Sequence, residues 1–92
     1  MEVRIRAFGV FQKVFKTGTF SIPIRDMETI NDLIYFLIKR YPKLQEQLIR
    51  DGDLKPEINI LVNGVNIRFG SYLDTKITGG DHIAILPPLV GG

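Results

Sequence analysis

The 92-residue sequence contains no cysteine at all. This absence excludes disulfides, thiolate metal ligands, iron–sulfur clusters and a cysteine nucleophile. A chain without disulfides is compatible with a reducing compartment, and we expect a cytoplasmic protein.

Long hydrophobic runs are also missing. No apolar segment approaches the ~20 residues that a membrane span requires, and the alternating stretch from Met1 to Arg6 has no signal-peptide core. The 12 basic and 10 acidic side chains are scattered along the chain and leave a net charge of +2. This pattern favours a solvated surface over a nucleic-acid footprint, so we expect neither a membrane nor a nucleic acid as partner.

The residues that usually carry catalysis are scarce. His82 is the single histidine, and neither Ser21 nor Ser71 lies in a glycine-elbow motif. Gly79-Gly80 lacks the lysine and the spacing of a phosphate loop, and Asp51-Gly52-Asp53 lacks the downstream ligands of a calcium loop. We therefore predict no metal site and no independent catalysis.

What the chain does contain is the composition of one globular domain. Hydrophobic residues make up 45% and charged residues 24% of the 92 positions. A chain of this length can bury one core without covalent staples. We predict a domain over residues 1–86 and a flexible C-terminal tail over residues 87–92, which ends in Gly-Gly.

Alternating polar and apolar residues predict the strands. They cover residues 2–8, 19–25, 57–62 and 82–86, with a shorter candidate at 65–69. Phe8 is out of phase and should lie on the solvent side, and Pro23 favours an edge position for the second strand. The first two strands would form an antiparallel hairpin with a long loop. Apolar residues on both faces of 57–62 favour a central position for that strand.

One clear helix is predicted from Thr29 to Tyr41. Thr29 and Asp32 form a variant of the capping box, and Pro42 ends the helix. The apolar residues at helical spacing are Ile30, Leu33, Ile34, Leu37 and Ile38. Residues 44–49 are a candidate for a second, short helix.

The order strand, strand, helix, strand, short strand, strand predicts one mixed sheet with the helix packed across one face. If the last strand pairs in parallel beside the first, the chain has the α+β architecture of a β-grasp, or ubiquitin-like, fold. The predicted core combines Ile30, Leu33, Ile34 and Leu37 with Val3, Ile5, Ile58, Ile60, Ile83 and Ile85.

The tail is the best remaining candidate for chemistry. Two prolines, Pro87 and Pro88, should end strand pairing, and the six residues from Pro87 to Gly92 can extend at most ~20 Å. The carboxylate of Gly92 is a poor electrophile when ionised, with a reference pKa of ~3.5. It would have to be activated, for example as an acyl-adenylate, by a partner that binds ATP. The alternative is that the terminal glycines are merely frayed.

Three segments resemble one family. They are Ile60-Leu61-Val62-Asn63-Gly64, Leu73-Asp74-Thr75 and the run from Gly79 to Gly92, and Val3 to Gly9 is also similar. Together they resemble the MoaD branch of the MoaD/ThiS sulfur-carrier family. The prolines before a tail that ends in Gly-Gly favour the MoaD branch over the ThiS branch.

The resemblance implies a function in molybdenum cofactor biosynthesis. A MoeB-like adenylyltransferase would use ATP to adenylate Gly92 and convert it to a thiocarboxylate, and this chain itself would bind no cofactor. The carrier would then insert its tail into a MoaE-like large subunit. In that reading the chain is the small, non-catalytic subunit of molybdopterin synthase.

The resemblance also implies which residues bind partners. Gly92 would carry the sulfur, and the residues before it, Pro87, Pro88, Leu89, Val90 and Gly91, would contact the partner's channel. Phe8, Ile67 and Leu86 match the family's apolar binding surface. Position 86 is often aromatic in the family, and the segment 65–72 is longer than in its shortest members, so Phe69 is an alternative to Ile67. Each of these side chains could instead belong to the core.

Two further functions stay open. The same activated Gly92 could form an isopeptide bond to lysines of target proteins, as in a ubiquitin-like modifier. Alternatively, the chain could be a ThiS-like carrier for another sulfur pathway. A plain interaction module with an incidental Gly-Gly is the remaining alternative.

Overall fold

A computed structural model describes residues 1–88. Twelve short elements follow one another along this part of the chain. They are β1 (Glu2–Ala7), α1 (Val10–Phe15), β2 (Thr19–Pro23), α2 (Ile30–Arg40), α3 (Leu44–Leu48), β3 (Ile49–Arg50), β4 (Asp53–Leu54), β5 (Asn59–Val62), β6 (Val65–Asn66), the 3₁₀ turns η1 (Ile67–Phe69) and η2 (Tyr72–Asp74), and β7 (His82–Leu86).

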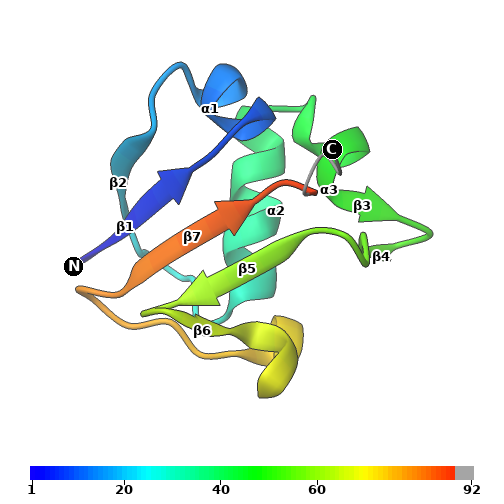
Figure 1. Ribbon diagram of the computed structural model, residues 1–92. Helices are drawn as coiled ribbons and strands as arrows, with labels where there is room; N and C mark the ends of the chain where they lie inside the picture. The colour runs from blue at the N-terminus through cyan, green and yellow to red at the C-terminus, as the bar shows by residue number, and fades with distance from the viewer. Residues whose placement is uncertain (89–92) are drawn as a thin grey trace.

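The main sheet has the strand order β2-β1-β7-β5-β6, and α2 crosses one of its faces (Figure 1). Strands β1 and β7 pair in parallel, and all other neighbours are antiparallel. This confirms the predicted mixed sheet and its parallel step. β2 lies at an edge, as Pro23 indicated. β5, predicted to be central, lies inside the sheet between β7 and β6, and the middle strand is β7. Strands β3 and β4 form a separate two-stranded sheet.

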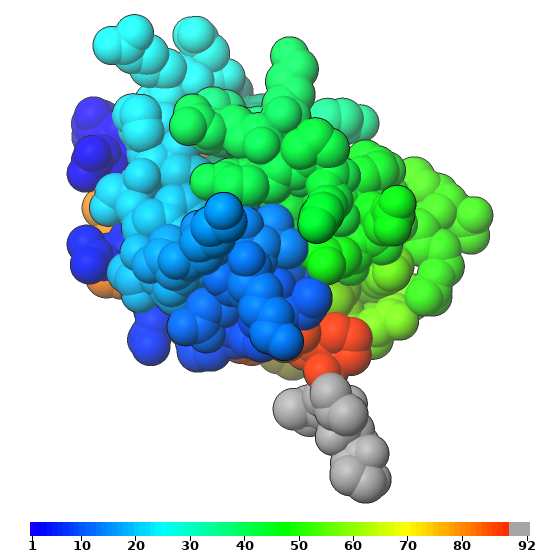
Figure 2. Space-filling model, turned by 90° about the horizontal axis from the view of Figure 1, so that it is seen from above, coloured from blue at the N-terminus to red at the C-terminus, as the bar shows by residue number. Residues whose placement is uncertain are grey.

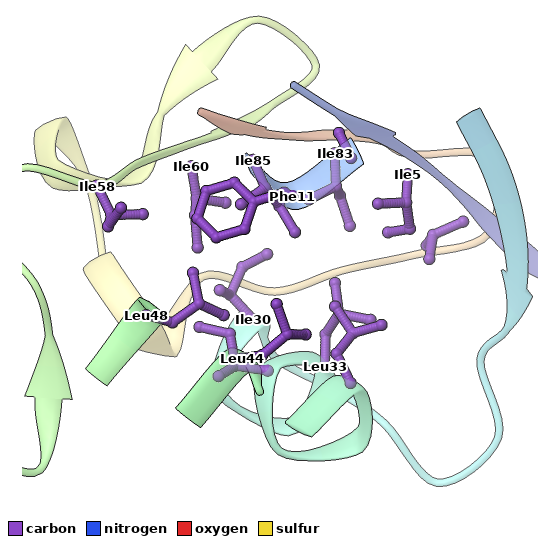
Figure 3. Close-up of a cluster of buried hydrophobic side chains, with 14 of the residues drawn as sticks. Ile5, Phe11, Ile30, Leu33, Leu44, Leu48, Ile58, Ile60, Ile83 and Ile85 are labelled. Carbon is purple, nitrogen blue, oxygen red and sulfur yellow. The ribbon is translucent and has the colours of Figure 1, made fainter. Parts of the chain in front are cut away.

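The core lies between the sheet and the helices. Ile5 is paired with Ile83 in register, and Ile85 is paired with Ile60, so these isoleucines share the face toward α2. Figure 3 shows Ile30 and Leu33 of α2 facing them across this layer, together with Leu44 and Leu48 of α3. All ten predicted core residues are buried.

The N-terminus of α2 has a full capping box. The Thr29 hydroxyl accepts a hydrogen bond from the Asp32 N–H at 3.3 Å, and the Asp32 carboxylate accepts from the N–H groups of Glu28 and Thr29 at 2.9 and 3.1 Å. These backbone donors lower the pKa of Asp32. The predicted helix start is therefore confirmed, and its end falls at Arg40, one residue before Tyr41.

Helix α1 was not predicted. The loop expected after the first strand contains a helix of six residues, and its two phenylalanines, Phe11 and Phe15, are buried four residues apart on one face. Six residues make fewer than two turns, so the sequence offers too little periodicity to identify the helix. The prediction of a hairpin with a long loop is therefore corrected, because that connection contains a helix.

The short fourth strand is also corrected. β6 covers only Val65 and Asn66, and the chain then tightens into the 3₁₀ turn η1. The Asn66 side-chain oxygen accepts a hydrogen bond from the Arg68 N–H at 2.9 Å, which competes with continued strand pairing. This turn rotates Ile67 into the core, where its side chain is 3% exposed.

Within residues 1–88, no helix is both long and apolar enough to cross a membrane.

Candidate functional site

The face of the sheet opposite α2 carries partly exposed apolar side chains. Ala84 of β7 is paired with Arg6 of β1 and with Leu61 of β5, so these three residues form a row across the sheet. Leu86 lies two residues further along β7 on the same face. Leu61, Ala84 and Leu86 are each only half-buried, whereas their neighbours Ile60, Ile83 and Ile85 are fully buried on the other face.

These side chains line a shallow depression of about 250 Å³. Phe8, which follows β1, lines it as well, and the Arg6 guanidinium lies 5.4 Å from the centre of the Phe8 ring. We call Phe8, Leu61, Ala84 and Leu86 the outer-sheet patch. It is an apolar surface rimmed by a cation, which is the composition of a protein-binding site.

The structure brings together two of the predicted partner-binding residues, Phe8 and Leu86. Ile67 lies in the core, so we remove it from the predicted surface. Phe69 is 87% exposed but does not line the depression. Leu61 was not predicted as a site residue, although its position between two inward-facing residues of one strand was the available signal.

The base of the tail packs against the turn after β1. Gly9 has φ +57°, and a Cβ at this position would lie 2.9 Å from Cγ of Pro87. Only glycine fits this backbone and this close approach without strain. The contact fixes where the chain leaves the sheet, directly beside the outer-sheet patch. Pro88 is exposed.

The remaining predicted site residues, Leu89, Val90, Gly91 and Gly92, lie outside the described residues. Their roles, and the predicted flexible tail, remain predictions.

A hydrogen-bonded cluster closes the other end of the strand pair β5–β7. The Asn63 side chain donates to the Asp81 carboxylate at 3.0 Å and accepts from the His82 N–H at 2.9 Å. The Thr78 N–H also donates to Asp81, at 2.8 Å. Burial alone would raise the pKa of Asp81, but these hydrogen bonds outweigh it and lower the pKa.

This cluster gives the motif residues Asn63 and Asp81 a structural role. Asn63 has φ +51° and Gly64 has φ +85°, the backbone of a tight hairpin turn, and the side chain of Asn63 ties that turn to β7. Among residues 1–88, no three histidine, aspartate or glutamate side chains lie close enough together to hold a metal ion.

Sequence comparison places these features in a known context. The ThiS family profile matches residues 5–92. Small archaeal modifier protein 3 of Haloferax volcanii is 32% identical over 92 residues, which is 100% of each chain. Sulfur carrier protein CysO of Mycobacterium tuberculosis is 35% identical over 68 residues, or 71% of this chain and 73% of CysO.

Solved structures show the same fold. Small archaeal modifier protein 1 of Methanosarcina acetivorans has a TM-score of 0.84 and 33% identity, covering 99% of this chain and 96% of that one. A Pyrococcus furiosus protein, provisionally described as subunit 1 of molybdopterin converting factor, has a TM-score of 0.78 and 26% identity, covering 97% and 99%. These similarities confirm the β-grasp prediction.

Proposed function

This chain belongs to the ThiS family, whose relatives are small sulfur carriers and modifiers, and we propose that it carries sulfur as a thiocarboxylate on Gly92. The single observation that supports this most strongly is the family match, which runs to the final Gly-Gly. The outer-sheet patch beside the tail base supports it from the structural side.

The proposed chemistry has two steps, both on a partner enzyme. A carboxylate oxygen of Gly92 attacks the α-phosphorus of ATP and releases pyrophosphate, which gives an acyl-adenylate. Hydrosulfide supplied by a donor then attacks the acyl carbon and displaces AMP, and loss of its proton leaves the thiocarboxylate. We assign the ATP site to a MoeB-like adenylyltransferase and propose that the chain works in the cytoplasm.

The chain's own residues bind and position. The outer-sheet patch would bind the partner, and the Gly9–Pro87 contact would orient the start of the tail. Pro88, Leu89, Val90 and Gly91 would lie in the partner's channel, where Gly91, which has no side chain, would let the backbone approach the reaction centre closely. Phe69 is a separate exposed apolar candidate for a second contact.

We propose molybdopterin synthase as one destination of the sulfur. The structural similarity to a protein described as a molybdopterin converting factor subunit supports it. The test is reconstitution of the thiocarboxylated chain with a MoaE-like subunit and the pterin precursor. Formation of molybdopterin, with one thiocarboxylate consumed per sulfur transferred, is the expected result. No transfer to the pterin would remove this destination.

Conjugation to proteins is the second candidate. The full-length similarity to small archaeal modifier protein 3 supports it. An epitope-tagged chain expressed in its own cells would then form adducts that contain Gly92 linked to a lysine Nζ, detectable by mass spectrometry after digestion. A chain that lacks Gly92 is the control, and adducts of equal abundance with that control would contradict the assignment.

A further inference from the structure

Four basic side chains that are scattered in the sequence meet around one cleft. Lys13 and Lys16 come from the end of α1, Arg40 ends α2, and Lys43 lies just before α3. The cleft has a volume of about 450 Å³, and within residues 1–88 no acidic side chain lines it. We call it the basic cleft. Its remaining lining residues are Val10, Val14, Tyr41, Pro42 and Gln47.

The basic cleft concentrates the charge of the molecule. Its four cations contribute +4, whereas the whole chain carries +2, so all other residues together carry −2 (2 − 4). Like charges drawn into one cleft repel one another, and an anionic occupant removes that repulsion. Charge complementarity therefore indicates an acidic occupant.

The walls of the cleft favour a polypeptide as that occupant. Val10 is 40% exposed, and Val14 and Tyr41 add apolar surface, which a bare phosphate ion cannot cover. An acidic polypeptide segment supplies carboxylates for the cations and apolar side chains for the walls.

The position of the cleft links it to the tail. Phe8 belongs to the outer-sheet patch, Gly9 touches Pro87 at the tail base, and Val10 lines the basic cleft. Figure 2 shows the blue surface of α1 beside the green segment after α2, with the red end of β7 next to them. A protein that covers the tail base therefore reaches both surfaces.

We propose that the enzyme which activates Gly92 holds this chain at two surfaces, the outer-sheet patch and the basic cleft, and presents an acidic segment to the basic cleft. The inference rests on the proposed function and adds a partner contact to it. Because the contact is electrostatic, it raises the association rate and the affinity without taking part in the chemistry.

The test is the double charge reversal Lys13→Glu/Lys16→Glu, assayed with the adenylyltransferase encoded by the same organism. The control, Arg25→Glu/Lys76→Glu, changes the net charge equally and lies outside both surfaces. We expect the reversal to raise KM for the carrier at least about tenfold with kcat nearly unchanged, as rim charges act on encounter. We also expect the salt dependence of KM to flatten, which a purely structural defect would not produce. The control should behave like the native chain, and melting curves identify any variant that fails to fold.

Two outcomes overturn the inference. One is a KM that is equal in the reversed, control and native chains. The other is binding of a single-stranded RNA that the reversal abolishes while KM is unchanged, which would assign the cleft to nucleic acid. In both cases the native chain is still activated, so the proposed function survives. Failure of the native chain to be activated by the enzyme and ATP would instead refute the proposed function.

Discussion

The two faces of the main sheet use the same strands for different purposes. On the inner face, Ile5 and Ile83 are at most 1% exposed because α2 covers them. On the outer face, Leu61 and Leu86 alternate with such residues along the strands, yet no helix within residues 1–88 covers them and they remain half-buried. Apolar side chains on neighbouring positions of one sheet thus divide into a set that stabilises the fold and a set that stays partly exposed, to which we assign the proposed partner contact.

The largest stability effect is expected on the inner side. Leu37→Ala removes a fully buried side chain of α2 and should lower the free energy of unfolding by about 2–5 kcal/mol. Urea or thermal denaturation measures this value. A loss below ~0.5 kcal/mol, the range of ordinary surface substitutions, would take Leu37 out of the core.

The Gly9–Pro87 contact should couple the tail to the outer face. Gly9→Ala places a Cβ 2.9 Å from Pro87 Cγ at φ +57° and ψ −128°, a backbone region that other residues rarely adopt, which should cost about 1–3 kcal/mol of stability and displace the tail base. We expect the rate of adenylation to fall by more than the folded fraction does. Gly52→Ala, where φ is +79° and no atom of another segment within residues 1–88 lies within 4 Å of the added Cβ, is the control because it places a side chain at a positive φ without a close contact. Equal rates in both variants would show that the tail base can shift without consequence.

The outer-sheet patch should affect binding rather than folding. Phe8→Ala should weaken the adenylyltransferase complex by at least about 1 kcal/mol, the cost of truncating an interface anchor. Calorimetric titration measures the affinity, and Ser21→Ala, on an exposed position of β2, is the control. Unchanged affinity with a large drop in melting temperature would assign Phe8 to the core.

A smaller effect is expected at the turn cluster. The pKa of Asp81 is lowered in the folded chain, so its contribution to stability is present above the unfolded pKa of ~3.9 and is lost as the pH falls through the folded pKa. Asp81→Asn should therefore be less stable at pH 7, by less than ~1 kcal/mol because the site is largely solvated. The difference from the native chain should shrink in acid. A difference that is constant down to pH 2 would rule out a role for the Asp81 charge.

The inner face was predictable from the sequence because alternation and helical spacing report directly on burial. The order of elements predicted a mixed sheet, but it left the parallel pairing of β1 with β7, which brings Ile5 beside Ile83, as a condition that the structure then confirmed. Ile67 was misplaced because the Asn66 side chain accepts a hydrogen bond from the Arg68 N–H and the strand gives way to a 3₁₀ turn, which alternation cannot reveal.

The outer features depend on contacts between segments that are distant in sequence. Leu61 becomes part of the outer-sheet patch only because β5 pairs with β7. The basic cleft forms only because α1 lies beside the loop after α2. Lys13 and Lys43 are far apart in the sequence, so the distribution of charge along the chain predicted only a solvated surface. Helix α1 itself is too short for its pattern to be read.

Gly92 is the proposed reactive residue, and the intact mass after incubation with the adenylyltransferase, ATP and a sulfur donor tests this role most directly. The native chain should gain the increment of one oxygen replaced by sulfur. A chain without Gly92 would hold its carboxylate about 3.3–3.6 Å short of the catalytic centre, and displacement by ~1 Å can already cost on the order of a hundredfold in rate. A chain extended beyond Gly92 has an amide in place of that carboxylate. Both variants should melt like the native chain and stay unthiolated. Thiolation of either variant as readily as the native chain would show that the Gly92 carboxylate is not the group that receives sulfur.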